Sequence, residues 1–384
     1  MTATIAFVAG VVGLLVGGHL VVRSASTIGS RFGLTPLVIG LTIVAAGTSA
    51  PELAVVLQSV AADDTPLAVG SIIGSNIANV LLVLGLVATL GVIHVTNRVV
   101  RVDIPIMIAA SVGLLVVSLD NEISRLDGVV LFGGLVAFVG WTLRAAPKLA
   151  PESFPAVDER PGDSRSAWRN SKPGLGRDLI GLIAGIGVLA VAARFVVSGA
   201  ESIAVALGVP ELIVGLTIVA LGTSAPEIVT TVIAAVQGRR DLAVGNAVGS
   251  NIFNILLVLG VSSVLADGIA IGRDAIELDL PIMVAAAVAC LPIVFWDNRL
   301  TRWEGMVFVG YYAAYLIFLS LDATGHRASD PFALVMVAFV LPLTVVTLAV
   351  VVVRQRRAAI APDQAMQKYR TTALETDEYS YESN

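Results

Sequence analysis

The feature that most constrains the fold of this chain is a thirteen-residue segment that occurs twice. The segment GLTIVAAGTSAPE, from Gly40 to Glu52, returns 175 residues later as GLTIVALGTSAPE, from Gly215 to Glu227. A second segment, GSNIAN at 74–79, returns at the same distance as GSNIFN at 249–254. Two motifs repeated at one spacing indicate that the fold contains two copies of a single unit.

Weaker matches extend the duplication downstream. The motif DIPIM at 103–107 matches DLPIM at 279–283, now 176 residues apart. The pair Asp-Asn at 120–121 matches 297–298 at a distance of 177 residues. One-residue slips of this kind accumulate in the loops of a duplicated membrane domain, so we expect each copy to fill most of one half of the chain.

Hydropathy supplies the second constraint. The chain is 56% hydrophobic and 14% charged, with a mean hydropathy of +0.89, whereas a soluble domain carries about 25% charged residues. Stretches such as 5–22, 129–141 and 332–353 contain no Asp, Glu, Lys or Arg. Because a helix needs roughly 20 mainly apolar residues to cross the hydrocarbon core of a bilayer, these stretches predict membrane-spanning helices.

We predict an all-α polytopic membrane protein with eleven membrane-spanning segments. The first segment is expected to be retained rather than cleaved as a signal peptide, because no basic residue precedes it. Five segments form a first half (1–143), a polar linker loop follows (144–177), and five more form a second half (178–321). An extra helix (331–353) without a counterpart in either copy and a polar tail (354–384) complete the chain. The segments are expected at 4–22, 36–59, 67–93, 103–119, 128–143, 178–197, 210–236, 242–264, 279–296, 303–321 and 331–353.

The distribution of lysine and arginine predicts the orientation. Twenty of the 24 basic residues fall in loops after odd-numbered segments or in the tail. Because cytoplasmic loops are enriched in Lys and Arg, we expect the N-terminus outside and the tail in the cytoplasm. A unit of five segments has an odd number, so the second copy enters the membrane from the opposite side. Transporters built from such inverted repeats hold their substrate near the bilayer midplane, where interrupted helices meet.

Glu52 and Glu227 occupy the same place in the two copies. An ionisable residue within a membrane-spanning helix costs roughly 2.5–3.5 kcal/mol on insertion scales. A single buried glutamate is often a protonated, hydrogen-bonded structural group. Two equivalent glutamates within nearly identical motifs favour a shared function instead, and we expect them to bind a cation together.

Hydroxyl groups accompany each glutamate. Thr48 and Ser49 precede Glu52 by four and three residues, so the three side chains can share one side of a helix. Pro51 has no amide hydrogen, which frees carbonyl groups near Gly47 for a ligand. The second copy repeats this set as Thr223, Ser224, Pro226 and Glu227.

The third segment of each copy adds further oxygen atoms. Ser75 and Asn79 are spaced i,i+4, and Ser250 and Asn254 repeat that spacing. These side chains are candidates for the same site. The asparagines that point elsewhere on the helix, and that are expected to hold the helices together, are Asn76 and Asn251.

The candidate ligands are carboxylate, hydroxyl, amide and backbone carbonyl oxygens, without sulfur or imidazole. Hard cations such as Ca²⁺ and Na⁺ prefer these ligands, whereas zinc and copper do not. Two carboxylates are neutralised equally by one Ca²⁺ or two Na⁺, and competition for shared ligands is the physical basis of exchange. The net charge of −5 argues against a nucleic-acid partner, and the single cysteine, Cys290, excludes an intramolecular disulfide.

On these residues the chain resembles the prokaryotic sodium/calcium exchangers of the cation/Ca²⁺ exchanger superfamily. The resemblance covers roughly residues 5–320 and is carried by the paired motifs GTSAPE and GSNI-x-N. It implies ten helices in two inverted halves, with the second, third, seventh and eighth helices forming a central site.

The resemblance also implies ligands for each ion. The Ca²⁺ ligands would be Glu52 and Glu227 with the carbonyl groups of Thr48 and Thr223. The Na⁺ sites would use the same glutamates with Ser49, Ser75, Ser224 and Ser250 and the carbonyl groups of Ala45 and Ala220. Some archaeal exchangers carry aspartate where this chain has Asn254, which matches Asn79 in the first copy. Glu52 and Glu227 are therefore expected to be the sole charges of the site.

The expected function is secondary active Na⁺/Ca²⁺ antiport across the plasma (inner) membrane by alternating access, with no enzymatic activity and no cofactor. Exchange of Ca²⁺ or another cation for H⁺ is the alternative, since glutamates can carry protons, but proton-coupled relatives typically show Gly-Asn-Ala-[Thr/Val]-Glu in place of GTSAPE. A cation channel fits less well, because the site is completed within one chain. An intramembrane metalloprotease would need a His-Glu-x-x-His segment, which the sequence lacks.

Overall fold

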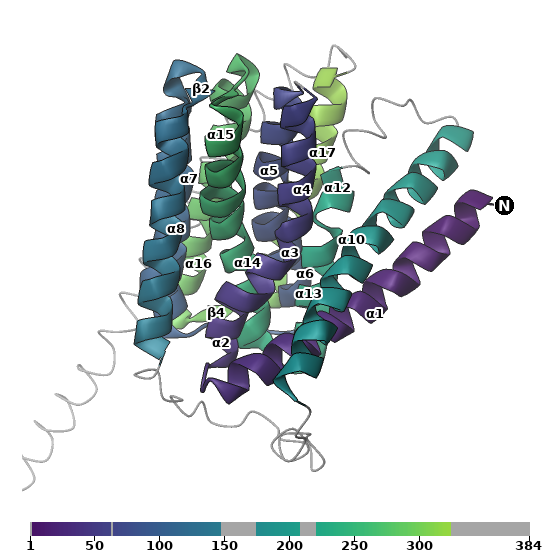
Figure 1. Ribbon diagram of the computed structural model, residues 1–384, viewed down its shortest axis with the longest axis vertical. Coiled ribbons are helices and arrows are strands. Elements are labelled where there is room, and N and C mark those ends of the chain that lie inside the picture. The colour runs from purple at the N-terminus through teal and green to yellow at the C-terminus, as the bar shows by residue number, and fades with distance from the viewer. Residues whose placement is uncertain (1, 63, 147–173, 208–219, 324–384) are drawn as a thin grey trace, which may run out of the picture. The chain divides into compact units, whose positions relative to one another are not determined.

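The computed structural model describes residues 2–62, 64–146, 174–207 and 220–323 (Figure 1). The chain divides into two compact units, Met1–His326 and Arg327–Asn384. The second unit, with the helix predicted at 331–353 and the tail at 354–384, lies outside the described residues, as does most of the loop predicted at 144–177. Both copies of the duplicated unit lie in the first.

The described residues are almost entirely helical, as the sequence predicts. Eight helices among them are long and apolar enough to cross a membrane, and helices satisfy every backbone hydrogen bond internally, which the hydrocarbon core requires. The number of spans and their orientation remain predictions. The elements of the first copy are α1 (Thr2–Arg31), α2 (Pro36–Ile39), η1 (Gly40–Val44), α3 (Ala45–Thr48), α4 (Ala50–Ala61), α5 (Thr65–Ala78), η2 (Asn79–Leu84), α6 (Gly85–Leu90), β1 (Ile93–His94), η3 (Val99–Asp103), α7 (Ile104–Val117), η4 (Ser118–Asp120), β2 (Glu122–Ile123) and α8 (Arg125–Ala145).

The second copy repeats this order of elements. Its helix at 210–236 is described only from residue 220 onward. Its elements are α10 (Leu175–Ala206), α12 (Ala220–Thr223), α13 (Ala225–Val236), α14 (Arg240–Phe253), η7 (Asn254–Leu259), α15 (Gly260–Ala266), β3 (Ile269–Ala270), η8 (Ala275–Asp279), α16 (Leu280–Asp297), β4 (Arg299–Leu300) and α17 (Arg302–Ala323).

The first helix of each copy is longer than its predicted apolar segment. Helix α1 continues past the expected end at residue 22 and includes Arg23 and Arg31, which the sequence reading placed in a loop. Arginine interrupts an apolar run but has a high helix propensity, so it does not end a helix. The chain leaves the helix near Gly33, which has a left-handed φ of +69°, a conformation that glycine adopts without steric cost.

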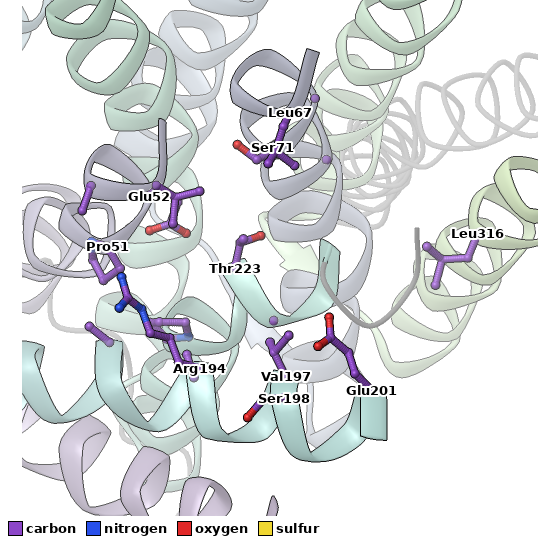
Figure 2. Close-up of a pocket in the computed structure, with 18 of the residues that line it drawn as sticks. Pro51, Glu52, Leu67, Ser71, Arg194, Val197, Ser198, Glu201, Thr223 and Leu316 are labelled. Atoms are coloured by element: carbon purple, nitrogen blue, oxygen red, sulfur yellow. The ribbon is translucent and has the colours of Figure 1, made fainter. Parts of the chain in front are cut away.

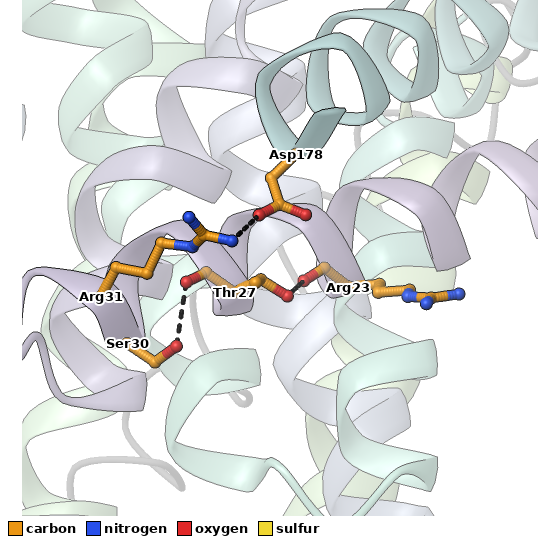
Figure 3. A network of polar contacts seen from close by, with 5 residues as sticks. All are labelled: Arg23, Thr27, Ser30, Arg31 and Asp178. Carbon is orange, nitrogen blue, oxygen red and sulfur yellow. Dashed lines mark hydrogen bonds and ion pairs between the residues drawn. The ribbon is translucent and has the colours of Figure 1, made fainter. Parts of the chain in front are cut away.

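Helices α1 and α10 lie side by side along much of their length (Figure 1). Glycines at equivalent places allow the contact: a Cβ on Gly10 would lie 2.7 Å from the Val196 nitrogen, and one on Gly185 would lie 3.0 Å from the Val21 nitrogen. An ion pair between Arg31 and Asp178 joins the two helices, with 2.9 Å between the charged atoms (Figure 3). The first helix of each copy therefore packs against the equivalent helix of the other copy.

The other contacts between the copies also come in exchanged pairs. Helix α8 of the first copy packs on α15 of the second, and α17 of the second packs on α6 of the first. A Cβ on Gly128 in α8 would lie 2.7 Å from the Gly260 oxygen, and one on Gly305 in α17 would lie 2.6 Å from the Gly85 oxygen. The α8–α15 and α17–α6 interfaces are therefore equivalent, and helix backbones touch at both.

Two short strand pairs connect the copies in the same exchanged manner. Strand β1 pairs with β4 and β2 pairs with β3, both antiparallel. The asparagine of the repeated Asp-Asn motif directly precedes a strand in each copy. Asn121 and Asn298 both have left-handed φ angles, +69° and +49°. The carbonyl of Asn298 accepts from the Val95 amide at 2.6 Å, and that of Asn121 accepts from the Ile271 amide at 2.8 Å. The motif therefore forms the junction between copies.

Helices α8 and α17 begin with matching N-terminal caps. The Asp127 carboxylate accepts hydrogen bonds from the Ser124 amide and hydroxyl at 3.0 and 2.5 Å. The Glu304 carboxylate accepts from the Thr301 amide and hydroxyl at 2.7 and 2.6 Å. Such reciprocal caps satisfy amide groups that the first helical turn leaves unpaired.

Adding a methyl group at the paired glycines should destabilise the protein. We expect Gly128→Ala and Gly305→Ala each to lower the free energy of unfolding by about 1–3 kcal/mol, because the new Cβ meets backbone atoms that cannot turn aside. The measurement is thermal unfolding of the purified protein in detergent. Gly133→Ala and Gly310→Ala are matched controls on the same helices, since no heavy atom lies within 4 Å of their Cβ positions. Equal losses in all four variants would contradict the packing described.

Candidate functional site

The helices that carry the two glutamates are interrupted immediately before them. Helix α3 ends at Thr48 and α4 begins at Ala50, and in the second copy α12 ends at Thr223 and α13 begins at Ala225. A proline follows each break by two residues and cannot donate a hydrogen bond back to the preceding turn. The break therefore lies where the proline in GTSAPE predicts it, at the serine between the two helices.

The next helix of each copy contains a π-helical turn. Segment η2 begins at Asn79 and η7 begins at Asn254, so the two candidate asparagines occupy equivalent positions at the start of a widened turn. Single π-helical turns within α-helices are frequent at functional sites, because the widened turn changes the direction of its side chains. The sequence spacing alone does not reveal this widening.

Glu52 and Glu227 meet in the centre of the helical bundle. Their side chains are 2% and 0% exposed, and the two carboxyl groups are close enough to interact with each other. None of the four carboxylate oxygens has a hydrogen-bond partner among the described residues. A buried carboxylate without partners is costly, so this pair requires a positive charge or protons between its oxygens.

The hydroxyl groups around the glutamates pair across the two copies. The Thr48 hydroxyl lies 3.2 Å from the Ser250 hydroxyl, and the Thr223 hydroxyl lies 3.4 Å from the Ser75 hydroxyl. Ser224 donates to Ser75 at 3.1 Å. The Thr48 side chain also lies beside the Glu227 carboxyl group. Each copy therefore places its threonine against the serine of the other.

The asparagines of the two GSNI-x-N motifs also connect the copies. The Asn254 amide donates to the Asn76 side-chain oxygen at 3.1 Å. The Asn76 amide contacts the Met283 sulfur at 3.6 Å, and the Asn251 amide contacts the Met107 sulfur at 3.4 Å. These two asparagine–methionine contacts explain why the methionine of DIPIM is repeated in DLPIM. They also give Asn76 and Asn251 the contacts between helices that were expected from the sequence.

The structure brings several of the predicted site residues together, since Thr48 contacts Ser250 and Glu227, and Ser75 contacts Thr223 and Ser224. The predicted site residues with described side chains are buried apart from Thr223, which is partly buried, while Ala220 is described only as the first residue of α12. The amide of Asn79 and the hydroxyl of Ser49 have no hydrogen-bond partner among the described residues. A place in the same site remains a prediction for Ala45, Ser49, Asn79, Ala220 and Asn254.

A cavity of about 540 Å³ leads to this centre from one side. Glu52 and Thr223 line it from the GTSAPE motifs, Ser71 lines it from α5, and Arg194 and Glu201 line it from α10 (Figure 2). Its wall is mainly apolar, since it also includes alanines, valines and leucines of α4, α10 and α17. The charged groups on α10 were not singled out in the sequence because they occur in no repeated motif.

On the opposite side of the centre, helix backbones touch. A Cβ on Gly245 of α14 would lie 2.6 Å from the Leu37 oxygen, and one on Gly40 would clash with the Leu242 carbonyl. A Cβ on Gly249 would lie 2.9 Å from the Cα atom of Leu41. The site is therefore accessible from the cavity and closed by packed backbone on the other side.

The sequence reading missed one polar group close to the site. Asn246 in α14 is completely buried and contacts the hydroxyl groups of Thr48, Thr230 and Thr231. Its counterpart in the first copy is Ser71, so a comparison restricted to matching motifs passes over it. The sequence signal that could have revealed Asn246 is the difference between its amide side chain and the serine at the equivalent position, Ser71.

A fold of interrupted helices around a buried pair of acids, with oxygen donors from two copies of one unit, defines a membrane transporter of cations. The family model described as "Sodium/calcium exchanger protein" matches residues 2–144 and again 178–321. The chain belongs to this family. It is accordingly a multi-pass membrane protein that transports ions and is not an enzyme.

Similar proteins support the assignment. The sodium/calcium exchanger MaX1 of Methanosarcina acetivorans is 30% identical over 337 residues, which cover 81% of this chain and 96% of that protein. The inner membrane protein YrbG of Escherichia coli is 38% identical over 131 residues, 34% of this chain and 40% of that protein. The solved structure of the sodium-calcium exchanger NCX_Mj soaked with Na⁺ and Ca²⁺ matches with a TM-score of 0.68 and 26% identity, covering 83% of this chain and 98% of that one.

Removing one charge of the buried pair should stabilise the ion-free protein. In buffer without Na⁺ or Ca²⁺, we expect Glu52→Gln and Glu227→Gln each to raise the free energy of unfolding by about 1–3 kcal/mol, because a neutral amide replaces an unpaired buried carboxylate. Thermal unfolding in detergent, with choline as the only monovalent cation, measures this. Glu277→Gln, which removes an exposed acid, is expected to change it by less than about 0.5 kcal/mol. Lower stability of both pair variants would contradict the description of an unpaired acid pair.

Proposed function

We propose that the protein exchanges Na⁺ for Ca²⁺ by alternating access, using the glutamate pair as the common site for both ions. The observation that carries the proposal is the approach of Glu52 and Glu227, whose four buried carboxylate oxygens have no hydrogen-bond partner among the described residues. Family membership, and the Na⁺ and Ca²⁺ in the soaked crystals of NCX_Mj, support the choice of ions. One Ca²⁺ or two Na⁺ would cancel the charge of the pair.

Each candidate ligand has a proposed role that follows from its place. The two carboxylates bridge the ion, and the carbonyl groups of Thr48 and Thr223, exposed where the helices break, complete its coordination. The serine hydroxyls, the asparagine oxygens and the carbonyl groups of Ala45 and Ala220 offer the additional oxygen ligands that a second Na⁺ requires. Hydroxyl and amide oxygens suit both ions, because neither ion demands a strict geometry from its ligands.

The cavity supports access from the outside in this conformation. Its lining includes Leu67, Glu201, Asp279 and Leu319, and all four belong to helix ends that the arginine distribution assigns to the outer side. The packed glycines Gly40 and Gly245 lie on the cytoplasmic side by the same assignment. Exchange of roles between the two copies would close the outer side and open the inner one, which is the principle of transport by inverted repeats.

Ca²⁺ uptake should depend on an opposing Na⁺ gradient. Vesicles reconstituted with the protein and loaded with Na⁺ are expected to accumulate ⁴⁵Ca²⁺ when diluted into Na⁺-free medium, since Na⁺ leaving the site frees it for Ca²⁺. Uptake is expected to fall to the level of protein-free vesicles when Na⁺ is equal on both sides. Glu52→Gln and Glu227→Gln should each abolish the uptake, whereas Glu277→Gln should preserve it. Full uptake without a Na⁺ gradient would refute Na⁺/Ca²⁺ exchange.

Exchange for protons is the second candidate, because carboxylates accept protons as well as metal ions. It is tested in the same vesicles by replacing the Na⁺ gradient with a pH gradient. If a pH gradient alone supports the full rate, the protein is an H⁺/Ca²⁺ antiporter. A saturable flux that requires a counter-ion also separates either antiporter from a cation channel, which would pass current without one.

A further inference from the structure

The two copies differ in chemistry at three positions that lie together in space. In the second copy Asn246, Thr230 and Thr231 occupy the places held by Ser71, Val55 and Val56 in the first. The second set can form hydrogen bonds between helices, whereas two of the three residues of the first set have no polar side-chain atom. The difference lies one helical turn from residues of the glutamate site.

Asn246 joins three helices through its side-chain amide. It is 0% exposed, and its Nδ2 atom donates to the hydroxyl oxygens of Thr230 at 3.1 Å and Thr231 at 2.8 Å. Its Oδ1 atom accepts from the Thr48 hydroxyl at 3.4 Å. The Thr230 hydroxyl in turn donates to the Pro226 carbonyl at 2.7 Å. A continuous chain of hydrogen bonds therefore runs from α3 through α14 to the backbone beside Glu227.

Both ends of this chain reach the proposed ion ligands. Thr48 is the last residue of α3, where the helix breaks, and its side chain lies beside the Glu227 carboxyl group. Pro226 is the residue before Glu227. The amide of Asn246 thus sets the distance between the threonine of one copy and the glutamate of the other.

At the equivalent described positions of the first copy, the side chains form different contacts. The Ser71 hydroxyl donates to the Ala68 carbonyl of its own helix at 2.9 Å and faces the cavity (Figure 2). Val55 and Val56 offer no hydrogen-bond acceptor in their side chains. The duplicated ligands are therefore held by different means on the two sides of the site.

We propose that Asn246 is a positioning residue for cation binding, which holds Thr48 and the Glu227 backbone at the separation that an ion requires. The inference rests on the proposed function, because it concerns the same site. Asn246 does not bind the ion itself, since its oxygen and its nitrogen are both committed to threonine hydroxyl groups. A buried amide whose hydrogen bonds are all made fixes the groups around it, and a partly satisfied one does not.

The test compares cation binding and transport in a small set of variants. Asn246→Ala removes the bridge, Thr231→Val removes one acceptor while keeping the shape of the side chain, and Thr231→Ser restores the acceptor. Ser71→Ala is the matched control at the equivalent place in the first copy. Binding is measured as the Ca²⁺ concentration that gives half of the maximal thermal stabilisation in Na⁺-free detergent solution, and transport as KM and maximal rate of ⁴⁵Ca²⁺ uptake.

We expect Asn246→Ala and Thr231→Val each to raise the half-saturating Ca²⁺ concentration and the KM about tenfold, because one buried hydrogen-bond network is lost in both. The double variant should be no weaker than the single ones, since both changes remove hydrogen bonds of the same amide group. Thr231→Ser and Ser71→Ala should stay within about twofold of the wild type. The maximal rate should change less than KM.

Four outcomes would overturn the inference. Asn246→Ala could bind Ca²⁺ as tightly as the wild type while unfolding at a lower temperature, which would make Asn246 a structural residue only. Ser71→Ala could weaken binding as much as Asn246→Ala, or Thr231→Ser could fail to restore it. If Ca²⁺ stabilises the wild type but uptake ignores Na⁺, the proposed exchange fails while the binding midpoints still decide the role of Asn246. A wild type that Ca²⁺ does not stabilise would overturn both.

Discussion

The structure depends on placing two carboxyl groups against each other in the interior of a helical bundle. Two like charges 4 Å apart repel by about 4 kcal/mol at an effective dielectric constant of 20, so the fold is stable only with a positive charge or protons at that point. The helix breaks before Glu52 and Glu227, and the widened turns at Asn79 and Asn254, bring further oxygen atoms to the same place. A binding requirement thus accounts for the irregular backbone at the centre.

The polar residues of each repeated motif contact residues of the other copy. The threonine of one copy lies against the serine of the other, and the asparagine of each third helix contacts a methionine from the opposite copy. Under the proposed alternating access, exchanging the roles of the copies would recreate the same contacts on the other side. Within the described residues, the chain through Asn246 occurs in one copy. The two proposed forms would consequently be similar in geometry but differ in stability.

Much of the fold and most of the site could be predicted from the duplication. The repeated motifs placed Glu52, Glu227 and their hydroxyl partners, and the prolines of GTSAPE predicted the breaks that the structure contains. Hydropathy located the spans but not the helix ends, since Arg23 continues a helix in spite of its charge. The π-helical turns escaped prediction because they leave no composition signal. Asn246 could not be predicted from the repeated motifs, because it differs from its counterpart Ser71 and the motifs consist of positions that are identical in both copies.

The exchanged strand pairs have a consequence for biogenesis. Strand β1 finds its partner only in β4, and β3 closes on β2, so about two hundred residues of chain separate the members of the first pair. A ribosome adding roughly 5–20 residues per second needs on the order of ten seconds or more to cover that distance. During this interval strand β1 and Gly85 of α6 have not yet met β4 and Gly305, their partners in the second copy. Assembly of the two copies is therefore a late event, completed once α17 has been synthesised.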